Sequence, residues 1–76
     1  MMSSEKKRRK ALIDWLHEVE QAEVNGKLDR KIYAKYSTNK LASIRDDWRI
    51  LIEHRAFEAS SFDTIQEYRA SLWKAR

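Results

Sequence analysis

The chain has 76 residues, of which 37% are charged, a formal net charge of +4, one Gly, and neither Pro nor Cys. A chain this short buries only about 60% of the surface that its unfolded form exposes, so we expect one domain, residues 1–76, with a thin core. The missing Cys excludes disulfides and thiolate metal sites, the single Gly excludes a glycine-rich phosphate loop, and the near absence of helix breakers predicts an all-α protein.

The first helix is predicted over residues 4–25. Ser3 or Ser4 can cap its start, and the Asn25-Gly26 pair is a typical left-handed stop. Five apolar residues recur at the spacing of one helical face, and we expect them in the core: Leu12, Trp15, Leu16, Val19 and Ala22.

The start of this helix carries five consecutive basic residues. Successive helical residues point all the way round the axis, so the run cannot form one face, and residues 1–10 are expected to be a basic arm or a helix extension. Three interpretations remain open: a solubilising tail, an arm on nucleic-acid phosphates, or a contact with an acidic protein. The candidate phosphate contacts here are Lys6, Lys7, Arg8, Arg9 and Lys10.

Residues 27–40 form a second basic block. A lone strand would have no partner, so we predict a short helix over 29–36 with Asp29 as its cap. Successive segments 1–10, 11–26, 27–40 and 41–76 carry +4, −4, +4 and 0 charges. The second block adds Lys31, Lys35 and Lys40 as candidate phosphate contacts, with Tyr33 and Tyr36 available to stack on bases or to pack.

A second long helix is predicted over residues 38–58, with Ser37 or Thr38 as its cap. Its apolar stripe is the clearest in the chain and comprises Leu41, Ile44, Trp48, Leu51 and Ile52. The opposite side places Ile50 and Phe57 among charged residues and near His54, and we treat these three as a candidate protein interface.

A last helix is predicted over residues 63–75, because Asp63 and Gln66 have the spacing of a capping box. Together the segments predict a compact bundle of three main helices plus a short helix. Beyond the residues of the first two stripes, the predicted core includes Ile32, Tyr36, Ile65, Tyr68 and Leu72.

The chemistry expected of this chain is that of a binding module. A core this small offers no obvious concave site for acid, base or nucleophile, so we expect no enzyme, no catalytic residue, no cofactor and no small-molecule substrate. His17 and His54 lie beside carboxylates but lack zinc-ligand spacing, so no metal site is expected. With no apolar run long enough for a membrane or a secretory signal, we expect a cytoplasmic, intracellular protein.

One segment is similar to a known family. The sequence YSTNKLASIRDDWRILIEHRAF (residues 36–57) resembles a helix in the N-terminal core-binding domain of phage and plasmid tyrosine recombinases, through Ser37, Asn39, Leu41, Asp47 and Trp48. DTIQEYRASL is similar to a later helix of that domain, so the resemblance covers residues 36–73, without the catalytic domain. It implies a helical domain that contacts DNA without cleaving it, through Lys40, Arg45 and Arg49.

These observations favour a small accessory or regulatory protein that binds nucleic acid through phosphate contacts, or that acts on a nucleic-acid machine. The alternative is a protein-interaction module, such as an inhibitor, adaptor or antitoxin-like partner, that uses the patch at Ile50 and Phe57. Self-association is a further possibility, because a second copy can complete a weak core.

Overall fold

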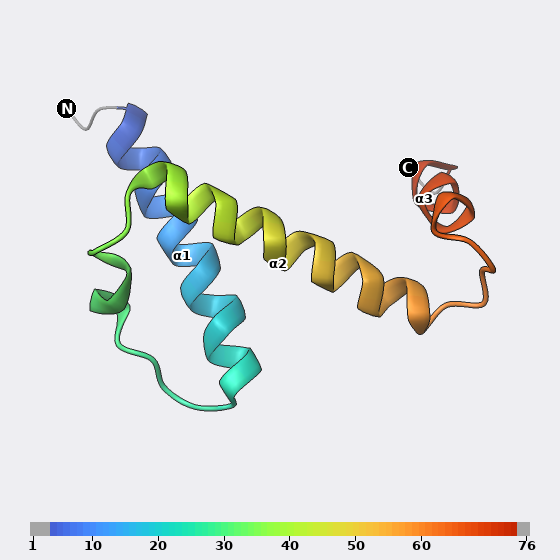
Figure 1. Cartoon of the computed structure of the whole chain (residues 1–76), viewed down its shortest axis with the longest axis horizontal. Coiled ribbons are helices and arrows are strands. Elements are labelled where there is room, and N and C mark those ends of the chain that lie inside the picture. Colours follow the sequence, from blue (N-terminus) through green and yellow to red (C-terminus); the bar gives the residue numbers. More distant parts are fainter. Residues whose placement is uncertain (1–3, 75–76) are drawn as a thin grey trace.

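The computed structural model describes residues 4–74 and contains four helical elements in that range (Figure 1). They are α1 (Ser4–Val24), the 3₁₀ helix η1 (Arg30–Tyr33), α2 (Thr38–Glu58) and α3 (Ile65–Lys74), with no strand among the described residues. The predicted all-α bundle of three main helices and a short one is confirmed. No helix within this range is long and apolar enough to cross a membrane.

Helix α1 ends through the backbone of Asn25 and Gly26. Asn25 has a φ of 53°, its N–H bonds to the Ala22 carbonyl, and the Gly26 N–H bonds to the Gln21 carbonyl. These two bonds form a Schellman motif, in which the left-handed residue is normally Gly. The stop was predicted at the right place, but Asn25 and not Gly26 adopts the left-handed conformation. The start of α1 is at Ser4, while the alternative cap Ser3 lies outside the described residues.

This assignment predicts opposite effects of Ala at two neighbouring positions. Asn25→Ala should lower the free energy of unfolding by about 1 kcal/mol, because a left-handed conformation is costly for a residue with Cβ and without a short polar side chain. Gly26→Ala should be neutral or slightly stabilising, since a Cβ there meets nothing closer than the Val24 carbonyl oxygen at 3.9 Å. Urea denaturation monitored by circular dichroism measures the free energy of unfolding of both variants. Equal losses at both positions would contradict the assignment.

Helix starts beyond the first loop are fixed by short polar side chains. Asp29 Oδ1 accepts from the Lys31 N–H at 2.9 Å, and Ser37 Oγ accepts from the Lys40 N–H at 3.1 Å. Asp29 was the predicted cap of the short helix, Ser37 was one of the two predicted for α2, and the range of α2 was also predicted. The short helix is a 3₁₀ turn that ends at Tyr33 instead of continuing to Tyr36.

The start of α3 differs from the prediction. The helix begins at Ile65, and Thr64 Oγ1 accepts from the Glu67 N–H at 3.2 Å, so Thr64 and not Asp63 is the cap. Thr64-Ile-Gln-Glu67 has the Ser/Thr-x-x-Glu spacing of a capping box, which competes with the Asp63–Gln66 pair one residue earlier. The predicted end at residue 75 lies outside the described residues.

The fully buried core lies where α1 and α2 meet. It consists of Leu12 and Leu16 from α1, Leu41 from α2 and Tyr33 from η1, which closes over them. Contacts advance along both helices together, from Trp15 with Arg49 to Glu23 with Arg55. The two helices therefore start at the same end of the molecule, and the segment between them returns along α1 (Figure 1).

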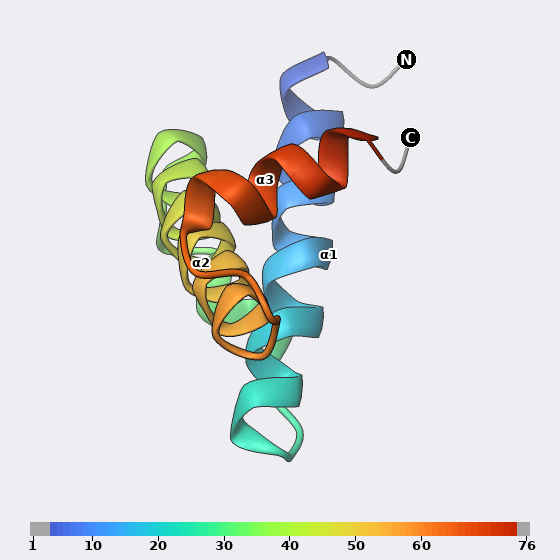
Figure 2. The same ribbon diagram turned by 90° about the vertical axis from the view of Figure 1, so that its right-hand side faces the viewer.

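Helix α3 packs against the C-terminal half of α2, at the far end of that helix from its start (Figures 1 and 2). Phe57 meets Tyr68 with ring centroids 6.2 Å apart, and Phe62 meets the same ring. The core in the structure is smaller than the core predicted from the sequence. Five of the predicted core residues are exposed instead: Ala22, Ile32, Leu51, Ile52 and Leu72.

Candidate nucleic-acid interface

A hollow of about 250 Å³ between α1 and α2 carries three arginines on its rim. Its floor is apolar, and its lining residues are Arg8, Ala11, Leu12, Trp15, Arg45 and Arg49. We call this the arginine hollow. All three arginines were predicted as phosphate contacts, from segments 37 residues apart in the sequence.

Helical spacing explains why these side chains converge. Arg8, Leu12 and Trp15 lie at i, i+4 and i+7 of α1, and Arg45 and Arg49 at i and i+4 of α2, so each set shares one helix face. Leu12 is only 3% exposed and belongs to the fully buried core. The floor of the hollow is therefore part of the best-packed region, and the packed helices fix the backbone positions from which the three arginines extend.

The three guanidinium groups differ in their engagement. Arg49 lies over the Trp15 ring, with Cζ 5.9 Å from the ring centroid, which is a cation–π distance. Arg45 pairs with the neighbouring Asp46 at 3.1 Å, and its side chain is 26% exposed. Arg8 is exposed and makes no ion pair or hydrogen bond within residues 4–74. Arginine stacked on an aromatic ring keeps its donor edge available for phosphate.

Two members of the first basic run are engaged by other residues of the fold. Arg9 is half-buried and donates to the carbonyls of Tyr33 and Ala34, both at 3.3 Å, which ties α1 to the end of η1. Lys10 pairs with Asp14 at 3.1 Å. Lys6 and Lys7 are exposed on the first turns of α1. The run is thus divided between a structural anchor and a charged helix surface, which sequence spacing alone does not reveal.

The second basic block does not line the arginine hollow. Lys31, Lys35 and Lys40 are all exposed, and the Lys35 ammonium lies 5.3 Å from the Tyr36 ring centroid. Of the two tyrosines left open between stacking and packing, Tyr33 packs, since it is only 1% exposed. A role for this block in binding stays a prediction.

Glu20 joins the three elements that form the core. Its carboxylate accepts from the Tyr33 hydroxyl at 2.6 Å and from the Trp48 indole N–H at 3.0 Å. Burial raises the pKa of the Tyr33 hydroxyl, and the hydrogen bond to the Glu20 carboxylate raises it further, because both disfavour the phenolate. The sequence placed Glu20 in an acidic block and beside His17, and no pattern marked it as a hydrogen-bond acceptor of the core.

Ion pairs occupy other acidic residues of α1. Asp14 lies between Lys10 and Arg30, and the Arg55 guanidinium donates to both oxygens of Glu23 at 2.9 and 2.7 Å. These basic partners lower the pKa of both carboxyl groups below their ordinary values, since they hydrogen-bond the charged forms. Of the four acidic residues of segment 11–26, Asp14 and Glu23 are therefore ion-paired, Glu20 is hydrogen-bonded, and Glu18 is exposed.

The predicted protein interface is only partly open. Ile50 is 58% exposed and His54 is exposed, whereas Phe57 is partly covered by the Tyr68 ring of α3.

No group of three or more potential metal ligands occurs among residues 4–74. Searches against family models, curated proteins and solved structures found no match.

Proposed function

We propose that this protein is a non-enzymatic accessory module that binds nucleic acid through its phosphates, with the arginine hollow as the central contact. The observation that supports the proposal most is the meeting of Arg8, Arg45 and Arg49 around one hollow. Arginine presents five donors in a planar fork that fits phosphate oxygens, and because the fork is planar, less side-chain freedom is lost for each hydrogen bond that forms.

Charge distribution in the fold also supports phosphate binding. The acidic segment 11–26, with a charge of −4, argues against phosphate binding, because a negative helix face repels phosphate. Asp14 and Glu23 are engaged by basic side chains, and Glu20 is held by Tyr33 and Trp48. Exposed Lys6 and Lys7 extend the positive surface along α1 from Arg8. These contacts position a module on a backbone and do not read bases.

The resemblance to the core-binding domain of tyrosine recombinases points the same way. Arg45 and Arg49 lie in the similar segment, and the resemblance implies DNA contact through them and Lys40. All three belong to α2. Duplex DNA is therefore the nucleic acid that we expect the module to bind.

Fluorescence anisotropy with labelled duplex DNA at several salt concentrations tests the proposal. Three neutralised phosphates give a slope of log K against log salt near −2.7, from about −0.9 per phosphate. Replacing all three arginines by Gln should remove most of this slope, and Arg8→Gln alone should reduce its magnitude by about 0.9. Lys27→Gln, a charge removed outside the hollow, is the control and should change binding little. Binding that is absent at low salt would refute the proposal.

A second candidate function, protein interaction, is favoured by the exposed Ile50. Ile50→Ser should leave DNA binding unchanged and abolish partner capture if this interpretation holds. Phe57 is less suited to the test, because its ring also packs on Tyr68 and its loss would disturb the α2–α3 contact.

A further inference from the structure

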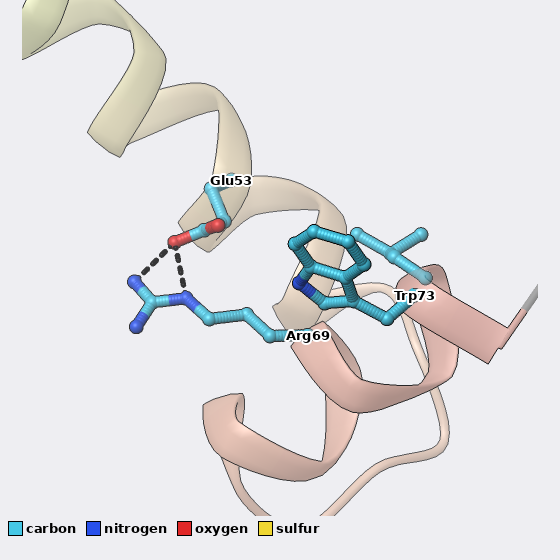
Figure 3. Close-up of a pocket in the computed structure, with 4 residues that line it drawn as sticks. Glu53, Arg69 and Trp73 are labelled. Carbon is cyan, nitrogen blue, oxygen red and sulfur yellow. Dashed lines mark hydrogen bonds and ion pairs between the residues drawn. The ribbon is translucent and has the colours of Figure 1, made fainter. Parts of the chain in front are cut away.

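The end of α3 exposes an unusual amount of apolar side chain. Trp73 is 77% exposed and Leu72 is 48% exposed. Trp is highly buried on average in folded proteins, so an indole in this position is atypical of a finished surface. The indole lies beside the Glu53–Arg69 ion pair, which is 2.5 Å long, but that pair leaves most of the ring uncovered (Figure 3).

Helix α2 carries a hollow of about 280 Å³ that is lined by Ile44, Asp47, Trp48 and Leu51. Its walls are preformed, because the Trp48 indole is held in place by Glu20. Leu51 is 40% exposed, although its spacing predicts a core position. The hollow thus has an apolar lining and one carboxylate, that of Asp47, which makes no ion pair or hydrogen bond with another described residue.

The accessible surface of the chain is larger than is typical of a monomeric protein of its mass. Its accessible surface is 6194 Å² for a mass of 9.1 kDa, whereas about 4,900 Å² is typical of a monomeric protein of that mass. The excess, roughly 1,300 Å², is more than the ~800 Å² that each partner buries in a standard interface. The Cα radius of gyration is 15.5 Å against about 11 Å for a compact chain of this length.

We propose that two copies of this chain form a symmetric dimer in which Trp73 and Leu72 of each copy fill the α2 hollow of the other. The Trp73 indole N–H donates to the Asp47 carboxylate of the second copy. Because the indole of each copy occupies the hollow of the other, the interface is isologous and closes as a dimer.

Charge favours a second copy over an acidic or basic partner. Residues 41–76 carry six basic and six acidic residues, so pairing through α2 and α3 brings no net charge together. Pairing through residues 1–10, which carry +4, would be repulsive. This dimer goes beyond the proposed function, and the residues that it uses are not those of the arginine hollow.

Sedimentation equilibrium over a wide concentration range tests the dimer. We expect the wild type to pass from monomer to dimer with concentration, and Trp73→Ser and Leu51→Glu each to weaken dimerisation at least about tenfold, as loss of a central interface anchor does. Both sites are exposed in one copy, so both variants should fold, which circular dichroism checks. Ile50→Ser removes an exposed apolar residue outside the hollow and is the matched control.

Mixing the two variants distinguishes reciprocal seating from a general apolar contact. Neither variant alone can place an indole in an intact hollow, because Trp73→Ser lacks the indole and Leu51→Glu lacks the apolar hollow. A heterodimer places Trp73 of the Leu51→Glu chain in the intact hollow of the Trp73→Ser chain. Labelled Leu51→Glu should therefore bind Trp73→Ser more tightly than it binds itself. A wild type that stays monomeric at every concentration, or a mixture that shows no gain, would overturn the proposal.

Discussion

Replacing Leu16 by Ala should lower the free energy of unfolding by about 2–5 kcal/mol, the usual loss for a buried Leu that leaves a cavity. Leu16 is 0% exposed and lies at the centre of a core with only three other fully buried members within residues 4–74. Small domains are stable by about 5–15 kcal/mol, and one of this size belongs near the lower end. We therefore expect the variant to keep only a small part of this stability, and its urea midpoint should fall well below that of the wild type.

The matched control for this experiment is Leu72→Ala, which removes the same atoms from a side chain that is 48% exposed. Its loss should stay below about 1 kcal/mol, because little apolar area returns to water. Urea denaturation at the lowest workable protein concentration measures both, so that self-association does not add to stability. Equal losses at the two positions would show that the core does not lie between α1 and α2.

Replacing Glu20 by Ala should cost about 2–4 kcal/mol, since it leaves two donors without an acceptor, at about 1–3 kcal/mol for each unsatisfied group. The donors are the buried Tyr33 hydroxyl and the Trp48 indole N–H, which come from η1 and α2. Trp48 is half-buried, so water satisfies part of its loss. The resulting variant should also loosen η1 against α1, which faster amide exchange in residues 28–36 would reveal.

Glu18→Ala is the control for the Glu20 variant, because it removes an exposed carboxylate from the same helix. A surface change of this kind stays within about 0.5 kcal/mol. A double-mutant cycle with Tyr33→Phe isolates the hydroxyl–carboxylate contact and should give a coupling energy of about 1 kcal/mol. A coupling energy of zero would mean that the 2.6 Å contact adds nothing to stability.

Stability and the proposed binding surface share one set of elements. Leu12 belongs both to the buried core and to the floor of the arginine hollow, and Trp15 supports Arg49 from α1. A variant that separates α1 from α2 therefore removes the hollow as well as the fold. For this reason the arginine variants, which lie on the rim, are the appropriate probes of binding.

The sequence by itself determined the helices and most of their ends. Ser37 and Asp29 cap where short polar side chains precede an apolar period, and the chain leaves α1 at Asn25, because these are local preferences of the backbone and of neighbouring side chains. It also identified Arg8, Arg45 and Arg49 as basic candidates, without indicating that they would meet.

Only the tertiary structure decided which apolar residues are buried and which charged side chains already have partners within the fold. Tyr33 is buried while its neighbour Ile32 is exposed, because η1 is a tight turn whose single inward position faces the α1–α2 junction. Arg9 donates hydrogen bonds to backbone carbonyls, whereas Arg8, one residue earlier, lines the hollow and remains available for a ligand. Such choices depend on how helices cross, and helical periodicity carries no information about crossing, since it describes each helix alone.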